Sequence, residues 1–418
     1  HYHCALSYLG GMTHSFKITL GLACITMACS TSPDMTTYLS HINLADNREL
    51  PFFIEQKGES LCIVNGDEQL PLTWSHVSDD NMQVYELKAF QGQFHLLFSD
   101  DHAQFSGFWL RPDRDESYPI TGSLTEHKKR RFSPTGMANE SDSTLWPLAE
   151  RYATTMATST EAPKQAIAEF QSHGNGVVTG SIMTETGDYR FLAGNRHGNH
   201  LMLSTFDGIH AYIFDMVITD KGIQGLHQSG AVYAETFEGH ADADASLSDP
   251  TQLSSYHEGD APLQFTLPDH ATGESFTYDG HANRVTLIQI LGSWCPNCMD
   301  ESEALKEIYQ EYHERGLDVI ALAFERSEDP LIARPALIKM VHDIGMPYPV
   351  LYAGKADKGA VEQLLPGLSN FMSYPTAILL DRQGLVREVH TGFNGPGTSL
   401  YQAWLAEQKS HIEELLNE

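Results

Sequence analysis

Short runs of alternating apolar and polar residues, separated by turn-forming residues, dominate the chain from residue 41 to about residue 245. Alternation with period two is typical of half-buried β-strands, so these runs predict a β-rich domain over residues 41–245. Their number, around ten, favours a β-barrel or a β-sandwich. The clearest runs are Leu61–Val64, Met82–Leu87, Gln93–Phe98, Phe105–Leu110, Ile167–Gln171, Val177–Met183, Tyr189–Leu192, Leu201–Ser204, Ala211–Val217 and Val232–Phe237.

The pattern changes after residue 245. Residues 246–262 are rich in small and polar residues and in proline, which is typical of a linker. Over residues 263–418 apolar strand-like runs alternate with amphipathic segments of helical period, and this predicts an α/β domain with a mixed sheet. The expected strands are Val285–Leu291, Leu317–Phe324, Pro349–Tyr352, Thr376–Leu380 and Val386–Thr391, and the expected helices are one after Trp294 and others at Pro335–Ile344, Asp357–Leu365 and Ser399–Leu416.

Charge excludes one large class of function. The chain of 418 residues has 26 basic and 55 acidic residues, a formal net charge of −29. A nucleic-acid-binding protein needs clustered Lys and Arg to contact phosphates, so we expect no nucleic-acid partner. The one basic cluster, Lys128–Arg131, is interpreted as a solvated loop.

The N-terminal segment has the order of an export signal. Lys17 is followed by the apolar run Ile18–Ala28, which is too short to span a bilayer as a helix. Small residues lead to Cys29, and the polar tether Ser30–Pro33 follows it. This arrangement resembles a bacterial lipoprotein signal, although Thr26 stands where leucine is usual. The sequence therefore predicts a leader over residues 1–29, a lipid on Cys29 and a tether over residues 30–40, with cleavage without lipid as the alternative.

The segment Val285–Asp300 carries the strongest chemical signal. An apolar run ends at Gly292, and Trp294-Cys295-Pro296-Asn297-Cys298 then opens a helix. A cysteine at a helix N-terminus is stabilised as a thiolate by unpaired N–H groups and by the helix dipole. Cys298, one turn further in, is placed to attack a mixed disulfide on Cys295. A zinc site would need further ligands at suitable spacing, which the sequence lacks, so we predict a redox pair and no metal.

Other polar and cysteine residues are interpreted as structural. Cys62 lies in a strand pattern and is expected to be a small buried hydrophobe. The cluster Thr184–Arg190 and the Asp207-Gly208 pair are turn formers, and Asp188 and Arg190 are expected to pair across a rim; the alternative is a ligand pocket at a barrel mouth. The scattered histidines of this half, including His210 and His227, are expected at the surface.

The C-terminal region resembles the thioredoxin-fold proteins. The motif Trp-Cys-Pro-Asn-Cys at 294–298 and Tyr374-Pro375-Thr376 at a strand start are the two fixed points of that superfamily. The resemblance implies that Pro375 is the cis-proline beside the cysteines. Within that superfamily the chain resembles more closely the TlpA-like membrane-anchored thiol-disulfide oxidoreductases, in which a glutamate follows the second cysteine by three residues, here Glu301. That family often has proline where this chain has Glu303.

This resemblance implies an α/β thioredoxin fold over residues 263–418, preceded by the β-rich barrel- or sandwich-like domain. It implies a thiol-disulfide oxidoreductase, expected to be a reductase, that needs no cofactor. Its site would comprise Cys295, Cys298, Pro375, Glu301 and Trp294. Glu301 would hold or relay the proton of thiol-disulfide exchange, or else only complement the helix dipole. The expected partners are disulfides of exported proteins and a membrane thiol-disulfide electron donor, and the expected location is the periplasm-facing bacterial envelope.

Two alternatives stay open. One is a peroxidase of the peroxiredoxin type, which shares the fold. Peroxiredoxins have a threonine or serine three residues before the reactive cysteine, where this chain has Gly292, and a proline seven residues before it, where this chain has Ile288. The other alternative is a binding or scaffold lipoprotein whose β-rich domain selects the partner.

Overall fold

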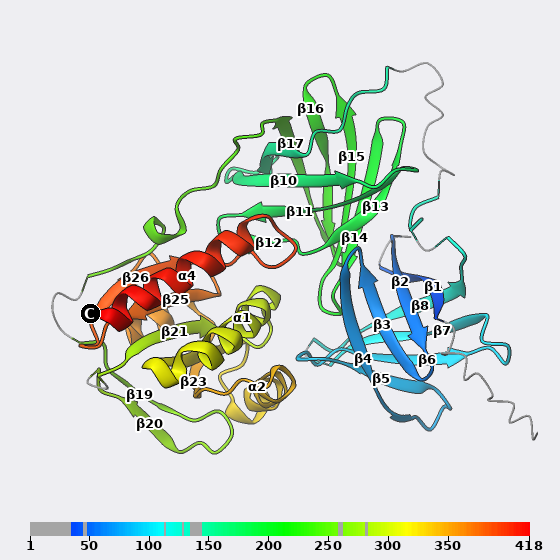
Figure 1. Ribbon diagram of the computed structural model, residues 1–418. Coiled ribbons are helices and arrows are strands. Elements are labelled where there is room, and N and C mark those ends of the chain that lie inside the picture. The colour runs from blue at the N-terminus through cyan, green and yellow to red at the C-terminus, as the bar shows by residue number, and fades with distance from the viewer. Residues whose placement is uncertain are drawn as a thin grey trace, which may run out of the picture. The chain divides into compact units, whose positions relative to one another are not determined.

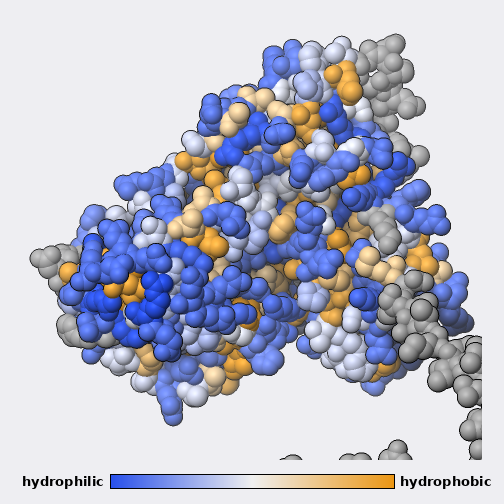
Figure 2. Space-filling model, in the orientation of Figure 1, coloured by the Kyte–Doolittle hydropathy of each residue, from blue (hydrophilic) through white to orange (hydrophobic). Residues whose placement is uncertain are grey.

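The computed structural model describes residues 35–44, 48–112, 114–127, 129–133, 144–257, 262–280 and 283–418. The predicted leader and the predicted lipidation site Cys29 lie outside these residues. On the face shown in Figure 2, hydrophilic residues predominate and hydrophobic ones are scattered, in keeping with the excess of acidic residues.

The β-rich region begins with a closed antiparallel barrel, here called the first barrel (Figure 1). Each strand pairs with the next, and β1 pairs with β8 to close the ring. Alternate residues point inward, and Tyr38, Phe52, Phe94 and Trp109 fill the interior. The strands are β1 (Thr36–Asn43), β2 (Glu49–Lys57), β3 (Ser60–Asn65), β4 (Glu68–Val77), β5 (Gln83–Leu87), β6 (Gln93–Phe98), β7 (Gln104–Arg111) and β8 (Glu116–Leu124).

A second antiparallel sheet follows, here called the second barrel because the pairing of β10 with β11 joins its two ends. The short strand β12 extends from β11 beyond the ring. Its core includes Tyr152, Phe170, Phe214 and Phe237. The strands are β9 (Arg151–Met156), β10 (Lys164–Ser172), β11 (Val177–Thr184), β12 (Gly187–Asp188), β13 (Leu192–His197), β14 (His200–Phe206), β15 (Ala211–Thr219), β16 (Gly222–Ser229) and β17 (Tyr233–Ala241).

The sequence predicted a β-rich region of around ten strands that forms one barrel or sandwich, whereas the structure has two barrels with more strands. Two of the strands it missed have weak signals. The strand β4 carries Pro71 and several exposed polar residues, and β16 has glycine at two positions. Each of these two strands is hydrogen-bonded to a neighbouring strand on both sides. This pairing outweighs their low intrinsic propensity for β-structure.

Arg131 links the two barrels, which corrects the prediction of a solvated basic loop. Its side chain is 3 % exposed and donates to Val64 O of the first barrel and to Ser204 O of the second, at 2.5 and 2.9 Å. Burial lowers the pKa of Arg131 to about 9. The sequence shows that this residue is charged, but it does not reveal the two backbone carbonyl groups that accept hydrogen bonds from it.

The described part of the predicted linker packs against the C-terminal region. It forms a short 3₁₀ helix, Pro250–Gln252, and the strand β18 (Ser255–Tyr256), which pairs with β24 (Leu368–Ser369). Thr391 Oγ1 also donates to Ser254 Oγ at 2.7 Å.

The C-terminal region is built on a five-stranded sheet of order β23-β22-β21-β25-β26 (Figure 1). β21, β22 and β23 are parallel, and β25 runs antiparallel to β21. A hairpin of β19 (Phe265–Pro268) and β20 (Ser275–Tyr278) precedes the sheet. The other strands are β21 (Val285–Leu291), β22 (Leu317–Glu325), β23 (Val350–Lys355), β25 (Thr376–Leu380) and β26 (Val386–Thr391).

Helices cover both faces of this sheet. Leu287 and Leu291 of β21 belong to the core shared with α1 (Pro296–Tyr312), α2 (Pro330–Ile344) and α4 (Leu400–Asn417). Ile288 and Ile290 face α3 (Lys358–Leu364) and the β19–β20 hairpin. Both sets are buried, which explains why β21 is a continuous apolar run. The predicted thioredoxin fold is confirmed.

The predicted helices and strands of this fold occur close to their expected bounds. The exception is α2, which begins at Pro330 and not at Pro335. The Asp329 side chain accepts from Leu331 N, and Pro330 occupies the first turn, where its missing N–H is tolerated. Pro335 lies inside the helix, so it does not mark the helix start.

Candidate active site

The cysteine pair lies where β21 ends and α1 begins. Cys295 is the N-cap of α1, and its Sγ accepts from Cys298 N at 3.2 Å. The two sulfurs are joined by a disulfide, with the Cα atoms 5.2 Å apart. The chain turns here because Gly292 ends the strand, Cys295 N donates to Gly292 O, and Pro296 fixes the first helical residue.

The two cysteines differ in access. Cys295 is 6 % exposed, whereas Cys298 is fully buried. Cys295 also has the N-terminal position, where the helix dipole stabilises a thiolate. The arrangement therefore fits Cys295 as the attacking residue and Cys298 as the resolving one.

Pro375 and Trp294 lie around this pair. The Tyr374–Pro375 peptide bond is cis, and Tyr374 O lies 3.6 Å from Cys295 Sγ. The Trp294 indole N–H donates to Phe324 O, and its ring meets the Tyr374 ring edge-on at 5.5 Å. The structure thus brings together the predicted residues that flank Cys295.

Glu301 is buried one turn after Cys298. Gln289 Nε2 donates both to Glu301 Oε2 at 2.8 Å and to Cys298 O at 3.3 Å. Glu301 Oε1 has no hydrogen-bond partner among the described residues. Burial raises the pKa of Glu301 to about 8, against the smaller lowering effect of the Gln289 hydrogen bond. This carboxyl group is therefore protonated at neutral pH.

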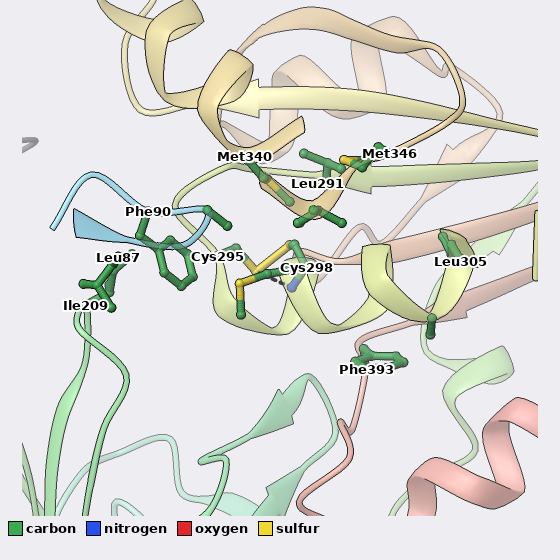
Figure 3. Close-up of a cluster of buried hydrophobic side chains, with 14 of the residues drawn as sticks. Leu87, Phe90, Ile209, Leu291, Cys295, Cys298, Leu305, Met340, Met346 and Phe393 are labelled. Carbon is green, nitrogen blue, oxygen red and sulfur yellow. Dashed lines mark hydrogen bonds between the residues drawn. A yellow bond between two sulfur atoms is a disulfide. The ribbon is translucent and has the colours of Figure 1, made fainter. Parts of the chain in front are cut away.

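The first barrel covers Cys295, which the sequence did not predict. Residues 88–92, between β5 and β6, are here called the cover loop. Phe90 of this loop is 3 % exposed and belongs to the same apolar cluster as Leu87, Ile209 and the cysteine pair (Figure 3). The loop is held at its base, where Ala89 N donates to Asp343 Oδ2 of α2 and Lys88 pairs with Glu303 of α1, at 3.0 and 2.6 Å.

A pocket of about 230 Å³ lies beside the cover loop and the redox motif. Phe90, Ile209 and Trp294 contribute apolar surface to its wall, and Arg111, Glu325 and Arg326 contribute charge. The Arg326 guanidinium lies 5.3 Å from the centre of the Trp294 ring. Residues of the first barrel and of the redox motif thus line the same pocket.

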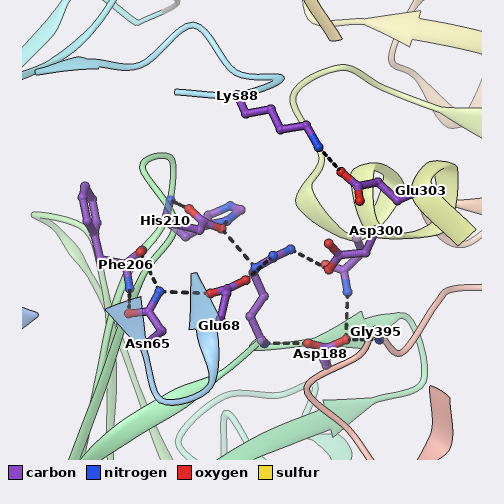
Figure 4. A network of polar contacts seen from close by, with 12 residues as sticks. Asn65, Glu68, Lys88, Asp188, Phe206, His210, Asp300, Glu303 and Gly395 are labelled. Atoms are coloured by element: carbon purple, nitrogen blue, oxygen red, sulfur yellow. Dashed lines mark hydrogen bonds and ion pairs between the residues drawn. The ribbon is translucent and has the colours of Figure 1, made fainter. Parts of the chain in front are cut away.

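The second barrel reaches the motif through polar contacts that the sequence did not reveal. Asn297, between the two cysteines, donates to Asp188 Oδ2 at 3.3 Å and to Phe393 O at 3.0 Å. Arg190 pairs with Asp300 of α1 at 2.5 Å (Figure 4). The signal in the sequence was the polar cluster Thr184–Arg190, but nothing in it pointed to α1.

The remaining candidate residues lie away from this site. Cys62 is half-buried and not fully buried as predicted, because it lies on the outward side of β3; burial nevertheless raises the pKa of its thiol to about 11. His227 is buried against Glu235, with its Nδ1 3.1 Å from the carboxylate, which corrects its predicted surface position.

Among the described residues, no cluster of His, Cys, Asp or Glu is suited to hold a metal ion. No helix in the described part of the chain has the length and apolar character needed to cross a membrane.

Comparisons with known proteins place the C-terminal region. Residues 257–404 match the Redoxin family. The thiol-disulfide oxidoreductase ResA of Halalkalibacterium halodurans is 27 % identical over 157 residues, 38 % of this chain and 77 % of that protein. The thiol:disulfide interchange protein DsbE of Allochromatium vinosum is 26 % identical over 145 residues, 34 % of this chain and 72 % of that protein. The structure of a secreted thiol-disulfide isomerase from Corynebacterium glutamicum covers 43 % of this chain and 96 % of its own, with 19 % identity and a TM-score of 0.31.

Proposed function

We propose that this chain is a TlpA-like thiol-disulfide oxidoreductase that reduces disulfides in exported proteins. The match of residues 257–404 to the Redoxin family and the similarity to ResA and DsbE support this proposal. The observation that carries the proposal is the Cys295–Cys298 disulfide at the N-terminus of α1, with the more accessible sulfur at the helix cap. The reductase direction is supported by the resemblance to the TlpA-like family.

The reaction begins from the reduced pair. The Cys295 thiolate attacks one sulfur of a substrate disulfide, and the other substrate sulfur leaves as a thiolate and takes up a proton. Cys298 then loses its proton and attacks Cys295 Sγ, which releases the second substrate thiol. The substrate gains two electrons and two protons, and the Cys295–Cys298 pair loses them.

The neighbouring residues serve these two steps. Glu301 holds a proton at neutral pH and shares Gln289 with the Cys298 backbone, so it is placed to exchange a proton with the resolving cysteine. Pro375 and Trp294 shape the surface against which the substrate strand lies beside Cys295. The pocket next to Trp294 extends that surface.

The oxidised pair must be reduced again by a dithiol. We propose a membrane thiol-disulfide electron donor as the source, with the protein in the bacterial envelope, facing the periplasm. A lipid on Cys29 would hold it at a membrane, through a tether shorter than the predicted residues 30–40, because Thr36 already begins strand β1 of the first barrel. The support is the pattern of residues 12–33 in the sequence.

The first test is the reduction potential of the Cys295/Cys298 pair, measured by equilibrium with dithiothreitol or glutathione. A reductase is expected near the thioredoxin value of about −270 mV, whereas a value near −120 mV, typical of strong disulfide-forming proteins, would overturn the direction. A second test uses Cys298→Ser, which should trap a substrate on Cys295 as a mixed disulfide. Cys62→Ser is the matched control, and it should trap nothing.

A further inference from the structure

A buried network of charges joins both barrels to the first turns of α1. Arg190, which is 5 % exposed, pairs with Glu68 of the first barrel and Asp300 of α1, both at 2.5 Å. Its Nε lies 4.0 Å from Asp207 Oδ2, and its backbone N–H donates to Asp188 Oδ1 at 2.5 Å. Figure 4 shows Glu68, Asp188 and Asp300 gathered in one network of polar contacts, with Asp300 on the helix.

The network has more acidic than basic groups. The Arg190 guanidinium faces three carboxyl groups, those of Glu68, Asp207 and Asp300, and the Arg190 backbone N–H contacts a fourth, that of Asp188. His210 contributes a further contact to Asp207, with Nδ1 at 3.2 Å. Because Arg190 carries one positive charge, ionisation of more than one of these carboxyl groups makes the network negative.

The network contacts the redox motif through Asp188 and lies near it through Asp300. The Asp188 carboxylate accepts from Asn297 Nδ2, and Gly395 N also donates to it at 2.6 Å. Asp300 lies two residues after Cys298 in the same helix. Both carboxyl groups are therefore close to the N-terminus of α1, where the Cys295 thiolate forms on reduction.

We propose that Asp188 and Asp300 are positioning residues that make the Cys295/Cys298 pair more reducing, by placing negative charge beside the helix N-terminus that would otherwise stabilise the Cys295 thiolate. This inference deepens the proposed function and rests on it. It assigns to the Gly187–Arg190 segment of the second barrel a role in setting the redox potential of a different domain.

The sign follows from electrostatics. A thiolate at a helix N-terminus is favoured by the positive end of the dipole, and stabilising the reduced form makes a pair a stronger oxidant. Negative charge nearby opposes this effect, more strongly in a buried site than in water. Burial raises the pKa of Asp300 to about 7, while Arg190 opposes that rise, so Asp300 is largely ionised at pH 8.

The test is Asp300→Asn, which removes the charge and retains an oxygen that accepts from Arg190. At pH 8 the equilibrium between the variant and glutathione should shift about tenfold toward the reduced Cys295/Cys298 pair. This shift corresponds to a reduction potential about 30 mV less negative than that of the wild type. The pH at which Cys295 becomes reactive to iodoacetamide should fall as well. Glu307→Gln removes an exposed charge from the same helix and should change neither quantity.

Asp188→Asn is the second variant and should shift both quantities in the same direction. If one variant loses its far-UV circular dichroism spectrum, the other still decides the question. Folded Asp300→Asn and Asp188→Asn proteins that match Glu307→Gln would overturn the inference. The wild-type potential tests the reductase direction, whereas the difference between variant and wild type tests this network, so the two failures are distinguishable.

Discussion

The C-terminal domain and the two barrels contribute to the same cysteine pair in different ways. The thioredoxin fold supplies the sulfur atoms, the helix N-terminus and the buried Glu301. The first barrel supplies Phe90, which covers Cys295, and the second barrel supplies Asp188 and Arg190, which contact α1 and the motif. Chemistry therefore belongs to one region, while access and electrostatics are set by the others.

This division has a physical reason. The reacting atoms need fixed geometry, which a strand-to-helix junction provides within a few residues. Access and local charge depend on groups that approach from outside the helix, and any element that packs against α1 can supply them. Changes in the two regions should thus have effects of different kind and size.

The largest effect is expected from removing the attacking sulfur. Cys295→Ser should lower disulfide reduction by at least about 10³-fold, because the nucleophile is lost. The assay is insulin reduction with dithiothreitol as the electron source. Cys62→Ser, in the first barrel, should keep full activity. A Cys295→Ser protein that remains active would show that the reacting atoms lie elsewhere.

Glu301→Gln should change the pH dependence of stability. The pKa of Glu301 is about 8 in the folded protein, against an ordinary value of 4.5. Folding therefore takes up a proton at pH values between 4.5 and 8. As a result, the free energy of unfolding falls as the pH rises through this range. At pH 7 the wild type should have lost about 3 kcal/mol from this group relative to acidic pH, and the variant should not lose it.

The measurement is urea unfolding of both proteins at several pH values between 5 and 8. The difference between them isolates Glu301 from other groups that titrate in this range, such as Asp300. Glu307→Gln, an exposed neighbour on α1, serves as the control and should follow the wild type. Parallel curves for wild type and Glu301→Gln would mean that this carboxyl group is ionised in the folded protein.

The C-terminal fold and its cysteine site could be predicted because their signals are local. All seven residues of β21 are buried, so the strand is visible as an uninterrupted apolar run. The helix that follows has its cap, its proline and its Gly316 stop in sequence order, and Gly316 has a φ of 114°, as a glycine stop requires. The resemblance supplied the cis-proline and Glu301.

The contribution of the barrels could not be predicted, because it depends on contacts between distant residues. Arg190 lies 122 residues from Glu68 and 110 from Asp300, and its local sequence fits an ordinary turn. Phe90 likewise follows a strand in a loop, a position that gives no sign of a buried partner. Both residues are buried against groups that lie far away in the sequence.

Phe90→Ala should raise access to Cys295 without changing its chemistry. Burial of a phenylalanine contributes roughly 2 kcal/mol, so its removal should make displacement of the cover loop easier and speed labelling of reduced Cys295 by a bulky maleimide about tenfold. Labelling by the smaller iodoacetamide should change less. Phe108→Ala, at an exposed position of the first barrel, is the control. Equal rates in the two variants would show that the cover loop does not limit access.

The smallest effect is expected at the base of the cover loop. Lys88 and Glu303 are both about two-fifths exposed, and such ion pairs contribute only about 0.5 kcal/mol. Lys88→Ala should therefore speed maleimide labelling about twofold, and about 1 M salt should reproduce this change in the wild type by screening the pair. Lys409→Ala breaks a similar exposed pair with Glu311 at the other end of α1 and should leave labelling unchanged. Suppose that Lys88→Ala is labelled at the same rate as Lys409→Ala while Phe90→Ala is labelled faster. The cover loop would then be held by apolar packing alone, and the Lys88–Glu303 ion pair would not contribute to the control of access by the first barrel.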